Sequence, residues 1–183
     1  MDAIELLVNR QSQPRLKEPA PCGEALANIK RAALRAPDHA SLKPWQFIVC
    51  EGNGRKKLGD LLEQAAIASD MSDRDIERAP ELPLRAPMVI ITIMKYKEHH
   101  KVPWVEQVAA AASAMSAMQM AAVAQGFQGI WRTGAYAQDE NLKSALYLEE
   151  QDEIMGFLYL GTPSVENVEK RISDLDEYFE HWN

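Results

Sequence analysis

The sequence predicts an α/β or α+β fold in which helices cover the faces of a β-sheet. Pro87–Met94 is a continuous apolar run rich in β-branched residues, which is typical of an interior strand. Val108–Gly126 is a long stretch rich in Ala and Met, which is typical of a buried helix. Helical and strand patterns also intermingle along the chain, as such folds require. The length of 183 residues fits one domain, residues 1–183, whose residues 164–183 form a C-terminal tail.

The N-terminal part of the chain should form two helices and a strand. The apolar spacing in residues 3–9 predicts a first helix, and Asp2 is placed to cap it. The spacing of apolar residues within 26–33 predicts a second helix, which should end before Pro37. Gln46–Glu51 is predicted to be a strand.

A turn, a helix and a polar excursion should follow. Gly52–Lys57 is predicted to turn the chain into a helix that covers residues 58–65. Ser69–Arg85 is polar and contains Pro80 and Pro83, so it is predicted to be a mobile excursion before the interior strand.

The C-terminal half should contain two further extended pieces. Gly126 is a suitable stop for the Ala- and Met-rich helix. Gly129–Trp131 and Ile154–Gly161 are predicted to be extended, with a short helix at Glu140–Leu146 between them.

The tail has the pattern of an amphipathic helix. Its apolar residues have the spacing i, i+3, i+4 and i+7, and two polar residues are placed for a capping box. The apolar residues are Leu175, Tyr178, Phe179 and Trp182, and the capping residues are Ser173 and Asp176. Aromatic side chains on one stripe must pack somewhere, either on their own subunit or on a second copy of the chain.

The composition excludes several classes of protein. The net charge is −7, which argues against a nucleic-acid-binding protein, and an anionic ligand would need a local cluster of Arg. Cys22 and Cys50 have no metal-type spacing, and residues 1–10 lack the basic and apolar regions of a signal peptide. A cytoplasmic protein with free thiols is therefore expected. Val108–Gly126 is rich in Ala, which favours a soluble buried helix over a membrane span.

The familiar catalytic motifs are missing. The glycines of "GFQGIWRTG" do not have the G-x-G-x-x-G spacing, and the sequence has no P-loop, G-x-S-x-G, H-E-x-x-H or C-x-x-C motif. His99 and His100 adjoin Glu98, but this pattern is more typical of a solvated loop than of a metal site. No metal site is expected. A chain of this kind suits reactions in which a bound cofactor performs the difficult step.

Three stretches combine Arg with hydroxyl or aromatic neighbours: Asn9–Arg15 ("NRQSQPR"), Arg35–Phe47 ("RAPDHASLKPWQF") and Gly129–Tyr136 ("GIWRTGAY"). Arg offers planar pairs of donors to phosphate, and Trp can cover an aromatic face. Taken singly, Trp45 and Trp131 are more typical of core positions, since Trp commonly anchors cores. Together, the three stretches would suit a ligand with a phosphate at one end and a flat heteroaromatic ring at the other.

In this order and spacing, the three stretches resemble the landmarks of the FMN-dependent nitroreductase family, especially its small NAD(P)H nitroreductases. The resemblance extends to "HKVP", "MQMAAVAQGF" and "GFLYLGTP", so it covers nearly the whole chain. It implies an α+β fold with a central mixed β-sheet surrounded by helices. It also implies a homodimer with a long buried interface helix and FMN bound at the subunit interface.

The resemblance also implies the site residues. Arg10, Gln11 and Ser12 would contact the flavin bound mainly to the other subunit, and Arg10 and Ser12 would lie toward its phosphate. The remaining FMN contacts would be Arg35, His39, Trp131, Arg132 and Thr133. The segment Ala121, Ala122, Val123, Ala124, Gln125 and Gly126 would contact NAD(P)H.

The sequence departs from the family pattern at several points. Gln11 stands where the family often has Arg, and Lys43 where many members have Gln. The tail is acidic where larger members carry a basic pair for the flavin phosphate, and Lys170 and Arg171 are the nearest candidates for that role.

The resemblance implies a two-stage, ping-pong oxidoreductase. NAD(P)H would reduce the flavin by hydride transfer to N5, and a nitroaromatic, quinone or similar electron-poor acceptor would then be reduced. No side chain need act as a nucleophile, and Arg35 or Arg132 could supply positive charge near N1–C2=O. Two alternatives remain: a flavin-binding sensor or carrier without turnover, and a dimerisation module whose aromatic tail binds a partner.

Overall fold

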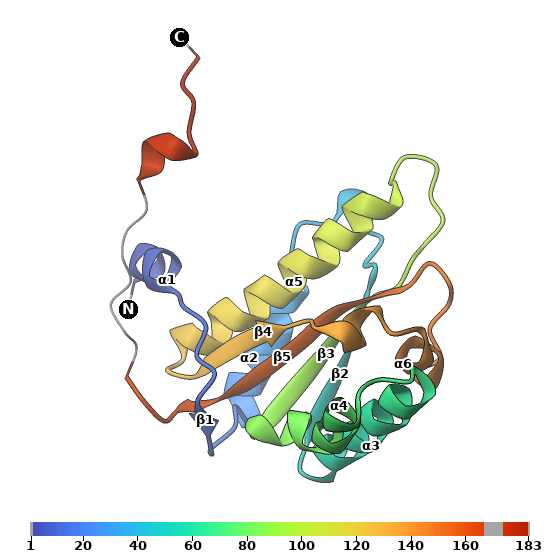
Figure 1. Cartoon of the computed structure of the whole chain (residues 1–183). Helices are drawn as coiled ribbons and strands as arrows, with labels where there is room; N and C mark the ends of the chain where they lie inside the picture. Colours follow the sequence, from blue (N-terminus) through green and yellow to red (C-terminus); the bar gives the residue numbers. More distant parts are fainter. Residues whose placement is uncertain (1, 167–173, 183) are drawn as a thin grey trace.

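The computed structural model describes residues 2–166 and 174–182. The strands are β1 (Leu16–Lys17), β2 (Trp45–Glu51), β3 (Met88–Met94), β4 (Gln128–Arg132) and β5 (Glu153–Pro163). The α-helices are α1 (Ala3–Asn9), α2 (Gly23–Ala33), α3 (Asn53–Ala68), α4 (Asp73–Arg78), α5 (Trp104–Ala124) and α6 (Glu140–Ala145). The 3₁₀ helices are η1 (His39–Ser41), η2 (Ala79–Arg85), η3 (Ala135–Gln138) and η4 (Leu175–Glu177). The fold is α+β, as the sequence predicts (Figure 1).

The centre of the sheet is formed by β3 and β5. β2 pairs with β3 at one edge, and β4 pairs with β5 at the other. All residues of β3 are buried, which confirms the prediction of an interior strand. Every strand pairing among the described residues is antiparallel, which corrects the expectation of a mixed sheet in this respect. For β2 and β3, the helices that connect the two strands return the chain to the end of the sheet from which it left. The last residue of β2, Glu51, therefore pairs with the first residue of β3, Met88.

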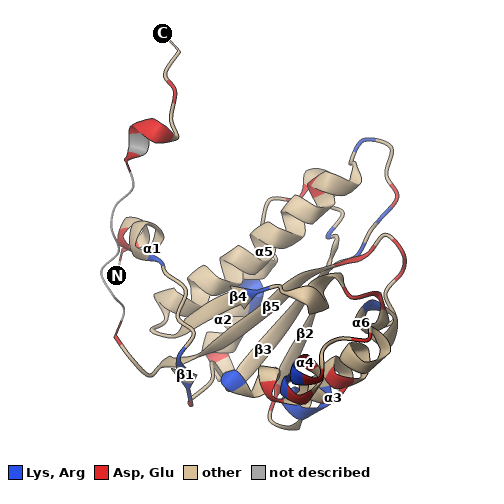
Figure 2. Cartoon of the chain, in the orientation of Figure 1, with Lys and Arg blue, Asp and Glu red and all other residues tan. Residues whose placement is uncertain are grey.

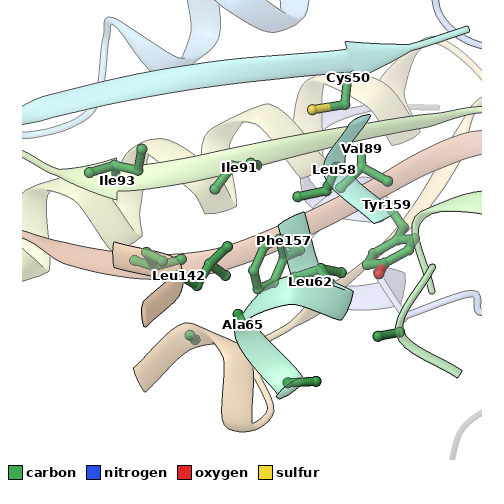
Figure 3. Packing of buried hydrophobic residues seen from close by; sticks show 14 of the residues in the cluster. Cys50, Leu58, Leu62, Ala65, Val89, Ile91, Ile93, Leu142, Phe157 and Tyr159 are labelled. Carbon is green, nitrogen blue, oxygen red and sulfur yellow. The ribbon is translucent and has the colours of Figure 1, made fainter. Parts of the chain in front are cut away.

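Helices cover both faces of the sheet (Figure 1). On one face, α2 and α5 pack on side chains that include Met88, Ile90, Leu158 and Leu160. On the other face, α3, η2 and α6 pack on the alternate residues of the same strands, and Figure 3 shows Leu58, Leu62 and Leu142 meeting them there. The alternate residues of β3 and β5 on this face are Val89, Ile91, Ile93, Phe157 and Tyr159. A strand covered on both faces must be apolar at successive positions, which explains the continuous apolar run of β3.

The segment Ser69–Arg85 is ordered as α4 and η2, so the prediction of a mobile excursion is wrong. The side chain of Ser72 caps α4 by accepting a hydrogen bond from the backbone N–H of Asp75. Gly59 lets η2 approach α3 closely, because a Cβ at this position would lie 2.5 Å from the carbonyl oxygen of Pro80. The polar composition reflects short helices that expose their outer sides. The glycine contact that holds them in place has no local sequence signal.

Two further boundaries differ from the predictions. α3 begins at Asn53, so most of the predicted turn at Gly52–Lys57 is helical. Among the described residues of the tail, only Leu175–Glu177 is helical, as one 3₁₀ turn, so the predicted amphipathic helix is wrong for this part. Tyr178, Phe179 and Trp182 are exposed. Ser173, Lys170 and Arg171 lie outside the described residues.

The helices α5 and α1 differ in how much of their surface is buried within the single chain. α5 is 21 residues long and has the length and composition of a membrane span, but it packs against the sheet and α2, and its buried residues lie along its length. Figure 2 shows that α5 carries almost no charge, whereas α3 and α4 carry both signs. α1 has the predicted capping box between Asp2 and Glu5 but no buried residue. Its apolar residues Ile4, Leu7 and Val8 are exposed.

Candidate flavin-binding site

The loop between α2 and β2 has an unusual backbone. Ala40, Ser41 and Lys43 all have φ values between 51° and 59°, the left-handed region that L-residues rarely adopt. The side chain of Asp38 fixes this conformation, because its carboxylate accepts a hydrogen bond of 2.7 Å from the backbone N–H of Lys43. Such conformations persist only where the surrounding structure enforces them, and they are common at binding sites.

The two candidate side chains of this loop lie on the surface. Nδ1 of His39 is 2.6 Å from a carboxylate oxygen of Glu106, in the first turn of α5. Arg35 lines a surface depression of about 260 Å³ together with Asp38, Lys43 and Trp45. The loop therefore presents Arg35 and His39 near the start of β2 and the N-terminal end of α5.

The third candidate stretch forms one wall of the largest cavity described. The cavity has a volume of about 550 Å³, within the usual range for small-molecule sites. Its lining includes the three predicted FMN contacts of this stretch, which are Trp131, Arg132 and Thr133. The opposite wall comes from α3, α4 and η2, and it includes Arg78 and Arg85.

Two atoms in the cavity wall lack hydrogen-bond partners. Nε of Arg132 and the hydroxyl oxygen of Tyr136 are buried, and neither has a partner among the residues that the structure describes. Buried polar groups are normally satisfied, so a bound molecule that met either group after a small side-chain adjustment would remove an energetic cost. A flat ring with carbonyl and nitrogen acceptors, such as the isoalloxazine of FMN, fits a cavity with these donors.

The cavity places two tyrosine hydroxyls that stay protonated, those of Tyr136 and Tyr159, in a lining that also contains arginines. Cζ of Arg132 lies 5.8 Å from the centroid of the Tyr159 ring. Burial raises the pKa of Tyr159, although Arg132 and Arg85 oppose the shift. Burial and the nearby carboxylates of Asp75 and Asp139 raise the pKa of Tyr136. Both phenols therefore remain neutral hydrogen-bond donors at physiological pH.

The outer edge of β4 is the second feature of this site. The carbonyl oxygen of Gly129 accepts hydrogen bonds of 3.0 Å from the backbone N–H of Gln13 and from Nε2 of Gln119, so it points away from β5. Alternate residues of a strand direct their peptide groups to the same side. The N–H and C=O of Trp131 therefore also face this outer edge. The bond to Gln13 brings the chain at Arg10–Ser12 beside β4 of its own subunit.

Gly156 in β5 determines how the Trp131 ring lies. A Cβ at Gly156 would be 2.6 Å from Nε1 of Trp131 and 2.6 Å from the carbonyl oxygen of Arg132, and the φ of Gly156 is +134°. Nε1 of Trp131 donates a hydrogen bond of 2.9 Å to the carbonyl oxygen of Met155. The indole packs on the α5 side of the sheet, whereas Arg132 faces the cavity on the α3 side.

One chain does not bring all the candidate residues together. β4 and β2 are opposite edges of the sheet, separated by β5 and β3. Three inter-strand spacings place them about 14 Å apart. Arg35 and His39 are therefore near one edge, and Arg10–Ser12 and Trp131–Thr133 are near the other.

The segment Ala121–Gly126 forms the C-terminal end of α5, away from the end that contacts His39. A helix of 21 residues is about 30 Å long. Ala122 and Val123 are buried, and Nε2 of Gln125 donates to the carbonyl oxygens of Ala25 and Ala121. Ala124 and Gly126 are exposed.

Sequence reasoning missed several residues of the site. The cavity residues Arg78 and Arg85 come from a segment that showed no binding motif. Tyr136 ends the third candidate stretch and Tyr159 lies in "GFLYLGTP", but neither was singled out as a site residue. Asp38 lay inside a quoted stretch, and its position before left-handed residues was the available signal, since Asp commonly bonds its own turn.

Comparisons with known proteins identify the family and support the fold. The model of the nitroreductase family matches residues 8–162. The Escherichia coli K12 protein named "Putative NAD(P)H nitroreductase YdjA" is 54% identical over 165 residues, which cover 90% of each chain. A nitroreductase-like family protein from Bacillus cereus has a TM-score of 0.85 at 22% identity, covering 100% of this chain and 96% of the other. An FMN-dependent nitroreductase from Clostridium difficile R20291 has a TM-score of 0.71 at 22% identity, covering 98% of each chain.

Proposed function

The chain belongs to the nitroreductase family, and from that premise we propose that it is an FMN-dependent, NAD(P)H-driven oxidoreductase with ping-pong turnover. Its acceptors would be nitroaromatics, quinones or similar electron-poor compounds. The observation that carries the proposal is the cavity at the end of β4, where Trp131–Thr133 lie among donors without partners. A bound FMN would supply the redox chemistry, taking hydride from the nucleotide and passing electrons to the acceptor.

The residues beside β4 would hold the flavin. The outward peptide group of Trp131 suits the polar edge of the ring, and Arg132 would place its charge beside N1–C2=O, where negative charge develops on reduction. Arg10, Gln11 and Ser12 would bind the phosphate end, and the hydroxyl of Thr133 would add a donor. The family resemblance assigned Arg10–Ser12 to the flavin held mainly by the other subunit. The hydrogen bond between Gln13 and Gly129 favours instead the flavin beside β4 of their own subunit.

Arg35 and His39 would reach this flavin from a partner subunit. Two observations support a homodimer with shared sites. Arg35 and His39 lie near the edge of the sheet opposite β4. The apolar face of α1 and the start of α5, at Trp104 and Val105, are exposed in the single chain. Burial of these surfaces in a dimer would make α5 the interface helix, and residues 164–183 would be a tail of the single domain that docks on the partner.

The nucleotide would approach through Ala121–Gly126, as the family resemblance implies. Exposed Ala124 and Gly126 are the accessible parts of this segment, and they lie just before β4. We propose a cytoplasmic location without membrane insertion, because α5 buries much of its surface inside the fold. Nucleic acid and metal ions are not part of the proposal.

Absorbance spectroscopy of the purified protein tests the function. The protein should retain about one FMN per chain, as each subunit of a symmetric dimer provides one site. Under anaerobic conditions, NADH or NADPH should bleach the flavin, and a nitroaromatic or quinone should restore the colour. A protein that takes up no FMN would contradict the proposal, and a yellow protein that neither nucleotide bleaches would be a flavin-binding protein without turnover. Stopped-flow reduction with both nucleotides gives the preferred donor.

A further inference from the structure

We infer that the β4 cavity selects an acceptor that carries a negative charge, an aromatic carboxylate, and that Arg78 and Arg85 bind the carboxylate. The inference rests on the proposed function, because it concerns the molecule that receives electrons from the flavin. It goes beyond that function by naming the charge of the substrate and the two residues that read it.

The charge of the cavity is opposite to that of the protein. Its lining contains three arginines, Arg78, Arg85 and Arg132, and a single carboxylate, that of Asp75. The whole chain has a net charge of −7. A local positive cavity on an acidic protein marks a site for an anion, since the overall field of the protein repels anions elsewhere.

The arginines are not neutralised by the protein. Across residues 2–166 and 174–182, no carboxylate lies within salt-bridge distance of any of the three guanidinium groups. With Arg132 assigned to the flavin, Arg78 and Arg85 remain on the opposite wall. Each can offer two parallel N–H donors, which match the two oxygens of a carboxylate.

The rest of the wall suits an aromatic ring. Leu82, Ile130 and Phe157 supply apolar surface, and the Tyr159 ring lies on the same side of the sheet. Apolar surface combined with a few convergent donors is typical of a site for a small aromatic anion.

The two arginines are carried by a segment of fixed position. Arg78 ends α4 and Arg85 ends η2. The contact between Gly59 and Pro80 holds this segment against α3, and the Ser72 cap fixes its start. The backbone that carries both arginines is therefore in place before a ligand arrives, although their side chains are exposed.

Benzoate and benzamide form a matched pair of probes, because they differ in charge but hardly in shape. Each is titrated into the FMN-loaded protein, and the change in the visible flavin spectrum gives its dissociation constant. Benzoate should bind at least about tenfold more tightly than benzamide, as expected for one charge-assisted contact. The same titrations use Arg78→Gln, Arg85→Gln and the control Arg74→Gln, which changes an exposed arginine of α4 outside the cavity lining.

Arg78→Gln and Arg85→Gln should each reduce the benzoate-to-benzamide preference about five- to tenfold, and Arg74→Gln should leave it unchanged. In steady-state assays, the ratio of kcat/KM for 4-nitrobenzoate to that for 4-nitrobenzamide should fall in parallel. Equal binding of the two probes by the unmodified protein would overturn the inference. The inference would also be overturned if Arg78→Gln and Arg85→Gln lost FMN but kept the benzoate-to-benzamide preference. That result would assign both arginines to flavin binding.

A loss of preference for NADPH over NADH, without a change in the benzoate preference, would assign the arginines to a nucleotide phosphate and also overturn the inference. The proposed function is tested separately. A protein that binds no FMN, or whose flavin NAD(P)H does not bleach, fails before any probe is added. If the protein binds FMN and NAD(P)H bleaches it, but benzoate and benzamide bind equally, then only the inference of an aromatic carboxylate acceptor is refuted.

Discussion

At the residue scale, the candidate site depends on polar groups that the fold buries without satisfying. Nε of Arg132 and the hydroxyl of Tyr136 are such groups, and both lie in the cavity beside β4. Nε of Arg55, Oγ1 of Thr92 and Oε1 of Gln128 also lack partners among the described residues, and they lie outside the cavity lining. Other buried groups are fully satisfied. The carboxylate of Asp152, for example, accepts hydrogen bonds from Nζ of Lys95 and from the backbone N–H groups of Tyr96 and Glu149. Of the unsatisfied groups, Nε of Arg132 and the hydroxyl of Tyr136 are the ones whose residues line the cavity, which makes these two residues the candidates to test.

Arg132→Ala should weaken FMN binding about tenfold or more, since it removes a charge-assisted contact in a partly desolvated site. The midpoint potential of the remaining bound flavin should become more negative by about 30 mV, because the reduced ring loses a positive neighbour. Equilibrium dialysis of FMN and a spectroelectrochemical titration measure the two effects. Arg31→Ala is the control, as Arg31 is an exposed residue paired with Glu24. Unchanged affinity and potential would remove Arg132 from the site.

Asp152 gives a prediction for stability against pH. Burial alone would raise the pKa of its carboxyl, but the hydrogen bonds from Lys95, Glu149 and Tyr96 outweigh burial and hold the pKa below its usual range. In the unfolded chain this carboxyl takes up a proton near its ordinary pKa of about 3.9. The unfolded state therefore binds more protons in this range. The stabilisation by Asp152 is complete above about pH 5 and is lost as the pH falls through the folded pKa.

Asp152→Asn should lower the free energy of unfolding at pH 7 by about 2 kcal/mol, since it removes hydrogen bonds to a charged group. The difference between the variant and the unmodified protein should shrink as the pH falls from about 5 to 3. Urea unfolding at several pH values measures it. Asp60→Asn, a change at an exposed carboxylate of α3, is the control and should have little effect. A difference that stays constant with pH would contradict the assigned role.

At the element scale, the pairing of β4 with β5 sets the geometry of the site. The pairing directs Arg132 to the cavity and the Trp131 ring to the other face of the sheet. Gly156 is the position in β5 that leaves room for both. The loop before β2 shows the same principle, because Asp38 holds three left-handed residues around it, Ala40, Ser41 and Lys43.

Gly156→Ala should destabilise the protein by about 2–4 kcal/mol, because the new methyl group meets backbone and indole atoms and φ is positive. FMN retention should fall with it, since β4 must shift away from β5. Gly52→Ala is the matched control, as Gly52 has a φ of +52° but no atom within 4 Å of the added Cβ. Thermal unfolding and FMN content compare the two variants. Equal, small effects would show that the space at Gly156 does not position β4.

At the scale of the whole molecule, the sheet separates the candidate residues. Arg35 lies near the start of β2, at one edge, and Arg132 lies in β4, at the other. We therefore propose that a flavin in contact with both residues receives one from each of two chains. The exposed apolar residues of α1 are consistent with an interface that the single chain leaves uncovered.

A mixed dimer tests this arrangement. Chains carrying Arg35→Ala and Arg132→Ala are given different affinity tags, co-expressed and purified as the heterodimer. Each homodimer of a variant should retain little FMN. The heterodimer should bind about one FMN per dimer, because one of its two sites combines the intact Arg132 of one chain with the intact Arg35 of the other. If both residues served the same subunit's site, the heterodimer would carry one lesion in each site and would recover no FMN.

The sequence by itself determined the local elements and much of the candidate site. The apolar run of β3, the spacing within α2 and the cap of α1 each carry their signal within a few residues, and all three agree with the structure. The stretch at Trp131–Thr133 was also predicted, and it lines the largest cavity described. Family resemblance, borne by motifs spread along the chain, led to the same family as the comparisons.

The tertiary structure alone decided which residues share the cavity, how the strands pair and where α4 and η2 lie. Arg78 and Arg85 line the cavity because Gly59 of α3 leaves room for the backbone at Pro80. Tyr159 lines it because its side chain lies on the face of β5 that borders the cavity. The separation of Arg35 from Arg132 follows from strand order. Local patterns encode the conformation of a segment, whereas close approach of distant segments depends on packing between them, which no single stretch of sequence contains.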